Sequence, residues 1–224
     1  MLARRTFLAL GTALLTSCGS PPEPGPFILA NVCHGLCSDV GAADLESVLV
    51  CTDSSCGTPI TNAVVEVNGT SLTWAGSYQG SVPVPEGSTV NLDVTIGALT
   101  YGVTATQFTT APTITEPTVT PPASSATWPA ASANTLSWTP GAPTAGASYV
   151  LDFAYFDGAF LQEGEVPITR GSMTFGPNFL SMGSGWVAIG IATATTNPIP
   201  IPNTAAQSGL YLSLYSQPVP LTVQ

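Results

Sequence analysis

Four cysteines lie close together near the start of the chain, and the only histidine lies among them. Three residues separate Cys33 from Cys37, four separate Cys51 from Cys56, and His34 follows the first cysteine. Thiolates and an imidazole at these spacings could bind zinc, whereas an even number of cysteines in an exported chain indicates disulfides. An oxidising compartment favours disulfides, so we expect them and no metal or cofactor, with zinc as the alternative. Of the three possible pairings we predict the two local ones, because each pair brackets a short turn.

No other set of residues predicts a catalytic centre. Because His34 is the only histidine, a Ser–His–Asp triad or a histidine base elsewhere in the chain is excluded. The nucleophile-elbow, P-loop and EF-hand patterns are absent. Glu163 and Glu165 would point to the same side of a strand, whereas the two carboxylates of a glycosidase flank the scissile bond. We therefore predict a protein without catalytic activity.

Three aromatic residues in the second half of the chain are candidates for a binding surface. Branched aliphatic residues alternate through 187–191 and leucines through 210–214, and each row should face the core. Trp186, Tyr211 and Tyr215 are then on the opposite faces of the two strands. Consecutive strands are usually neighbours, so the three rings should share one outer face that could bind a sugar or a protein partner. The alternative is that they cover a domain junction or pack beneath the loop that joins the strands.

The first eighteen residues determine where these elements are expected to act. Arg4-Arg5 precedes an apolar run over 7–15, which is shorter than the roughly 20 residues that a membrane-spanning helix needs. The run ends in Leu15-Thr16-Ser17-Cys18, which resembles the lipobox of bacterial lipoproteins. That resemblance implies a signal peptide, a lipid on Cys18 and attachment to a membrane of the bacterial cell envelope, periplasmic or surface-exposed. Residues 4–8 also resemble the twin-arginine export motif, and the export pathway stays open.

Composition excludes several classes of partner. Arg170 is the only basic residue after Cys18, against 13 acidic residues, so the mature chain would carry a formal charge of −12. Nucleic acid is excluded as a partner, because no basic patch can neutralise its phosphates. Attraction to anionic lipid is excluded for the same reason, so membrane attachment must depend on the acyl chains.

The rest of the chain predicts an all-β fold of two tandem Greek-key-type β-sandwich domains. The full chain has 21 prolines and 22 glycines, and nearly all of them lie after Cys18, where they separate short stretches of alternating apolar and polar residues; Asn68-Gly69 is typical of a two-residue hairpin. Residues 57–69 resemble carboxypeptidase-regulatory-like and transthyretin-like domains, and residues 136–141 resemble fibronectin type III-like domains; these resemblances imply the fold only. The expected segments are a signal peptide (1–17), a lipidated cysteine with a Pro-rich tether (18–26), a disulfide-bearing sandwich (27–110), a linker or first-strand region (111–127) and a second sandwich (128–224).

These features together predict a lipid-anchored envelope protein that binds a protein or carbohydrate partner. The alternative is a structural spacer at the cell surface with no specific ligand. An enzyme with an unrecognised site is the least favoured class.

Overall fold

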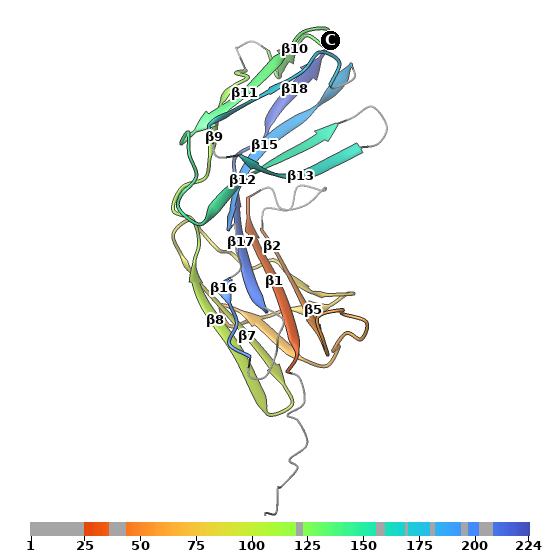
Figure 1. The fold of residues 1–224 in the computed structure, drawn as a ribbon, viewed down its shortest axis with the longest axis vertical. Coiled ribbons are helices and arrows are strands. Elements are labelled where there is room, and N and C mark those ends of the chain that lie inside the picture. The colour runs from red at the N-terminus through yellow and green to blue at the C-terminus, as the bar shows by residue number, and fades with distance from the viewer. Residues whose placement is uncertain are drawn as a thin grey trace, which may run out of the picture.

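The described part of the chain is built from strands and contains no helix (Figure 1). In the computed structural model, the described residues are 25–35, 44–119, 123–155, 160–168, 170–179, 182–193, 197–201 and 208–224. The all-β prediction is confirmed. Within these ranges no helix is long and apolar enough to cross a membrane. The lipobox, Cys18 and most of the tether lie outside the described residues.

Three sheets make up the fold, and the largest has eleven strands. Its members are β1 (Phe27–His34), β2 (Asp44–Cys51), β5 (Thr73–Trp74), β6 (Tyr78–Gly80), β10 (Ala126–Trp128), β12 (Ala147–Tyr155), β13 (Phe160–Ile168), β15 (Gly183–Thr193), β16 (Asn197–Pro198), β17 (Gly209–Tyr215) and β18 (Val219–Val223). A four-stranded sheet contains β3 (Val64–Val67), β4 (Thr70–Ser71), β7 (Thr89–Ile96) and β8 (Leu99–Thr106). A three-stranded sheet contains β9 (Thr113–Glu116), β11 (Asn134–Thr139) and β14 (Ser172–Phe175).

The large sheet forms one layer of two sandwiches that lie end to end (Figure 1). At one end its strands β1, β2 and β17 pack against the four-stranded sheet around the first core, which includes Val48, Val90 and Leu92. At the other end β15 and β18 pack against the three-stranded sheet around the second core, which includes Leu136 and Ile189. The two sandwiches therefore share a sheet instead of being joined only by a linker.

Local sequence patterns predict the strands of the first sandwich well. Asn68 and Gly69 have φ of 49° and 76°, as a type I′ turn requires, and Val67 pairs with Thr70 across them. The strand after the turn is only Thr70–Ser71, because buried Leu72 fills the first core and the chain then passes to the large sheet. The alternation through β7 places its apolar row in the core, as predicted.

The predicted core rows of the second half are also confirmed. The aliphatic residues of β15 at 187, 189 and 191 and the leucines of β17 at 210, 212 and 214 are all buried. In β12, Tyr149 and Leu151 also face the second core, whereas the side chains of Phe153 and Tyr155 lie outside the described residues.

One strand crosses the division expected between 27–110 and 128–224. β17 pairs in parallel with β1 over the whole register from Leu29↔Gly209 to His34↔Leu214, and with β15 on its other edge. As a result Leu210 belongs to the first core and Leu214, four residues later, to the second. The C-terminal part of the chain thus contributes to both sandwiches.

Candidate functional site

Cys33 and Cys51 lie near opposite ends of the β1–β2 ladder. Cys51 and Cys56 form the predicted disulfide, with Cα atoms 5.1 Å apart. Cys33 is also disulfide-bonded, but its predicted partner Cys37 lies outside the described residues, so that pairing stays a prediction. Cys51 is opposite Phe27 in the ladder, six residues from Cys33 along β1, or about 20 Å. The four cysteines therefore cannot share one zinc ion, and the described residues contain no cluster that could hold a metal.

The turn inside the Cys51–Cys56 loop is held by an aspartate. The Asp53 carboxylate accepts a hydrogen bond from the Ser55 amide at 2.8 Å and another from the Ser55 hydroxyl. These bonds favour the charged form and lower the pKa of Asp53 below its ordinary value. This loop is a structural element and offers no reactive thiol.

The three predicted aromatics do share one face of the large sheet. Tyr215 is directly opposite Gly190 in the antiparallel β15–β17 pair, so both point to the same side. Trp186 is four residues from Gly190 on β15, and Tyr211 is four residues from Tyr215 on β17. Because these strands run in opposite directions, Trp186 and Tyr211 lie on either side of Tyr215. We call Trp186, Tyr215 and Tyr211 the aromatic row.

The aromatic row is long and its members are not in one cluster. Eight residue steps along the strands separate Trp186 from Tyr211, which corresponds to about 26 Å. All three side chains are half-buried. At the centre of the row, a Cβ atom built on Gly190 would lie 2.7 to 2.9 Å from ring atoms of Tyr215, so the ring packs directly on the glycine backbone. Tyr215 thus covers β15 at Gly190, with Trp186 and Tyr211 to either side.

The row continues into apolar residues that the sequence analysis did not select. Leu29 on β1 and Leu49 on β2 form a cross-strand pair on the same face as Tyr211, and Leu45 lies farther along β2. All three leucines are half-buried. The sequence could have indicated these leucines, since β1 and β2 carry apolar residues on both faces, a pattern typical of strands that are covered on both sides.

Known proteins offer no guide to this face. No protein-family model matches the chain, and no curated protein is significantly similar to it.

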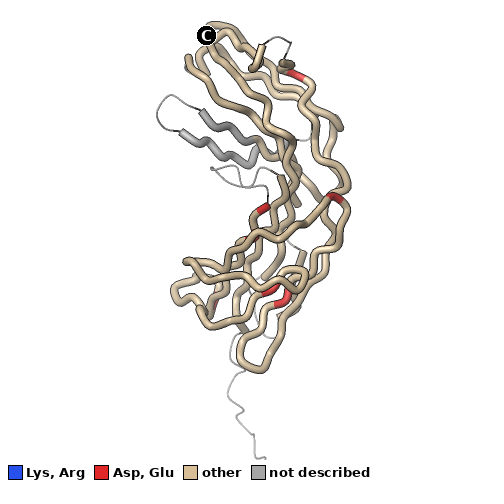
Figure 2. The backbone as a smooth tube through the Cα atoms, turned by 180° about the vertical axis from the view of Figure 1, so that it is seen from behind, with Lys and Arg blue, Asp and Glu red and all other residues tan. Residues whose placement is uncertain are grey.

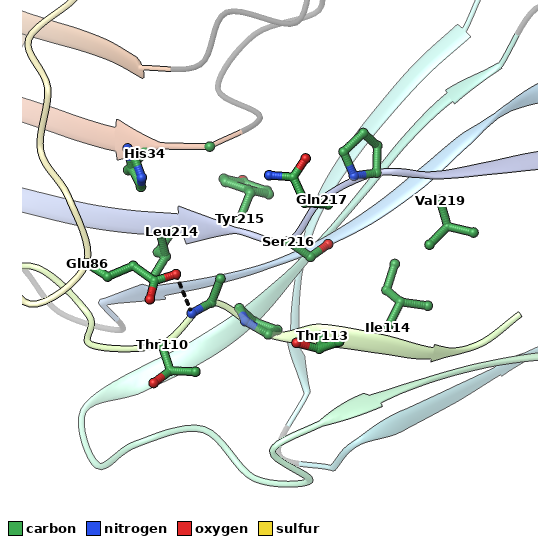
Figure 3. A pocket seen from close by; sticks show the side chains of 14 residues that line it. His34, Glu86, Thr110, Thr113, Ile114, Leu214, Tyr215, Ser216, Gln217 and Val219 are labelled. Atoms are coloured by element: carbon green, nitrogen blue, oxygen red, sulfur yellow. Dashed lines mark hydrogen bonds between the residues drawn. The ribbon is translucent and has the colours of Figure 1, made fainter. Parts of the chain in front are cut away.

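A second candidate site is a cleft of about 440 Å³ between the two sandwiches. Figure 3 shows the cleft with His34 and Glu86 at one end and Ile114 and Val219 at the other. Its walls come from the end of β1, the segment 214–219 between β17 and β18, and residues 110–114, which lead into β9. We call it the waist cleft.

The walls of the waist cleft are fixed by a buried glutamine and a shared phenylalanine. Gln107 is 1% exposed, and its side-chain amide donates to the Ser213 carbonyl at 3.0 Å. Its carbonyl oxygen accepts from the Phe108 amide at 2.9 Å, and the Phe108 ring packs against both cores. These contacts fix residues 107–108, where the chain leaves the first sandwich, against β17, which belongs to both.

His34 directly follows the disulfide-bonded Cys33 and ends β1, opposite Asp44 of β2. Its Nδ1 atom is hydrogen-bonded to the Asp44 Oδ1 atom, and its ring lines the waist cleft. Asp44 orients the imidazole, but the described contacts of His34 include no serine, threonine or cysteine that it could activate.

Glu46 is the most unusual charged residue of this region, and the sequence analysis missed it. It is completely buried in the first sandwich, where one carboxylate oxygen accepts from the Val82 amide at 2.7 Å. The other oxygen has no hydrogen-bond partner among the described residues. Burial is the main cause that raises the pKa of Glu46 to about 7; the charge of Asp44 adds to it and the Val82 bond opposes it. The sequence could have indicated this burial, because Glu46 alternates with Val48 and Val50 and therefore lies on the same core-facing side of β2.

Glu163 and Glu165 were not expected to be catalytic. They lie on β13, whose backbone pairs with β12 through Asp152↔Glu163. Their side chains are outside the described residues.

Proposed function

We propose that the protein is a non-catalytic binding module, held on a membrane of the bacterial cell envelope by lipid on Cys18. Its ligand is an extended protein segment or carbohydrate chain that lies along the aromatic row. The observation that supports this best is the placement of Trp186, Tyr215 and Tyr211 in a line on one sheet face, with each side chain half-buried. Aromatic rings of this kind give a large contact area with little loss of conformational entropy.

The low charge of the chain supports the same proposal. Figure 2 shows the acidic residues scattered along the described backbone and not gathered in one patch. With a single basic residue after Cys18, the chain cannot form several ion pairs with an acidic ligand, and its scattered carboxylates form no concentrated site for a basic one. We therefore propose that binding depends mainly on apolar contact and neutral hydrogen bonds, which the aromatic row can supply.

We predict that replacing the two ends of the row, Trp186→Ala with Tyr211→Ala, abolishes ligand binding and lowers the melting temperature by only a few degrees. The measurement is binding of the full chain to a glycan array and to envelope proteins in pull-downs, with thermal unfolding in parallel. Phe179→Ala is the control, because Phe179 is 51% exposed and follows β14, in the other layer of the second sandwich. Buried aromatics would instead cost about 3–5 kcal/mol each on truncation. A stability loss of that size would mean that the row serves packing, and the spacer alternative would replace the proposal.

For the anchor, we predict that Cys18→Ala abolishes acylation and releases the chain from the membrane fraction. Attraction to anionic lipid cannot replace the acyl chains, since Arg170 is the only basic residue after Cys18. Intact mass spectrometry of the wild-type protein should show a mature chain that begins at Cys18 with a diacylglycerol group. A mature chain that begins elsewhere and carries no lipid would overturn the anchoring proposal.

A further inference from the structure

We infer that the waist cleft is a second binding site and that its ligand is a neutral polyhydroxylated compound, one or two units of an uncharged polysaccharide. The inference goes beyond the proposed function, because the cleft shares only Tyr215 with the aromatic row and can be tested without changing that residue. At about 440 Å³ the cleft is in the size range of small-molecule sites.

The lining combines the two kinds of surface that a sugar ring presents. Ile114 and Val219, both packed against the second core, form an apolar wall suited to the C–H faces of a pyranose (Figure 3). Thr110, Thr113 and Gln217 add two hydroxyls and a carboxamide, which can donate to and accept from sugar hydroxyls.

The two ionisable residues of the lining are held by hydrogen bonds within the protein. The His34 Nδ1 atom is hydrogen-bonded to Asp44, so the ring is oriented and its Nε2 atom can form a hydrogen bond with a ligand hydroxyl, which both donates and accepts. Glu86 accepts a hydrogen bond from the Ala111 amide through one carboxylate oxygen at 3.2 Å, so its other oxygen can accept from a ligand. Because both side chains are already held, a ligand would not need to order them.

Anionic ligands and metal ions fit this lining poorly. Among the described residues no lysine or arginine lines the cleft, so an anionic sugar or a phosphate would meet Glu86 without a compensating cation. A metal ion would find only Glu86 and His34, and the described residues contain no group of three such ligands. Neutral hydroxyl groups, which both donate and accept, can form hydrogen bonds with every polar group of the lining.

The test is calorimetric titration of the full chain in detergent with four neutral tetrasaccharides, made of β-glucose, α-glucose, mannose and N-acetylglucosamine. At least one should bind in the cleft. The double variant Thr113→Val with Gln217→Ala should weaken that binding about tenfold, the expected loss for two neutral hydrogen bonds. The matched control, Thr127→Val with Gln79→Ala, changes an exposed threonine of β10 and an exposed glutamine of β6 in the same way and should bind like the wild type.

Three results would overturn the inference. One is that none of the four sugars binds, and another is that trigalacturonate, which is anionic, binds more tightly than all of them. The third is that the cleft variant binds as the wild type does. If binding is then lost only in the Trp186→Ala, Tyr211→Ala variant, the proposed function stands and the cleft site fails.

Discussion

Glu46→Gln should raise the free energy of unfolding at pH 8 by about 3 kcal/mol and should leave it nearly unchanged at pH 4. Glu46 is fully buried, and its pKa rises from 4.5 to about 7 in the folded chain. Between these two values the folded state binds more protons than the unfolded state. The stabilisation from protonated Glu46 is therefore fully present below pH 4.5 and is lost as the pH rises through about 7. Glutamine keeps the acceptor for the Val82 amide and cannot ionise, so the variant should lose this pH dependence.

The measurement is chemical denaturation of both proteins at several pH values from 4 to 8. Glu116→Gln, the same change at an exposed residue of β9, should leave the curve parallel to that of the wild type. The prediction fails if Glu46→Gln also gives a parallel curve, because Glu46 would then be ionised in the folded protein across this range. Success would show that ionisation of Glu46 destabilises the folded chain as the pH rises from about 4.5 to about 7.

The sequence predicted the strands because burial in a sandwich alternates with a period of two. In β7, β15 and β17 every second residue is a large apolar one that faces the core. Each core-facing row could therefore be assigned without knowing which strands pair with it. The same reasoning placed Trp186, Tyr211 and Tyr215 on one outer face. It could not show that the row is about 26 Å long, because that depends on the register of Tyr215 against Gly190.

Contacts between distant strands account for what the sequence did not predict. The waist cleft and the His34–Asp44 pair arise from pairing between strands, and nothing in a local pattern specifies which strands pair. The crossing by β17 was missed for the same reason: its leucines look alike, yet parallel pairing with β1 carries Leu210 into one core while Leu214 stays in the other. The burial of Glu46 could have been predicted from the sequence, since Glu46 lies on the same side of its strand as Val48 and Val50.

Because β17 contributes to both cores, we expect a second large effect on stability when one of its leucines is truncated. Leu210→Ala should lower the free energy of unfolding by about 3 kcal/mol, within the range for a fully buried leucine. The loss of packing should weaken the first sandwich, whose strands β1 to β8 are more than 100 residues away in sequence. The reason is that Leu210 is fully buried in the first core beside Ala30 of β1. Leu214→Ala is the matched control: it makes the same change, at 1% exposure, on the same strand, but in the second core.

Hydrogen exchange followed by mass spectrometry separates the two variants. Leu210→Ala should speed exchange in peptides from β3, β7 and β8, and Leu214→Ala in peptides from β10 and β11, because each cavity weakens the core that it opens. If both variants speed exchange in the same peptides, the leucines of β17 are not divided between two cores. If Leu210→Ala affects only β10 and β11, the parallel pairing of β17 with β1 is wrong, and the C-terminal segment belongs to the second sandwich alone.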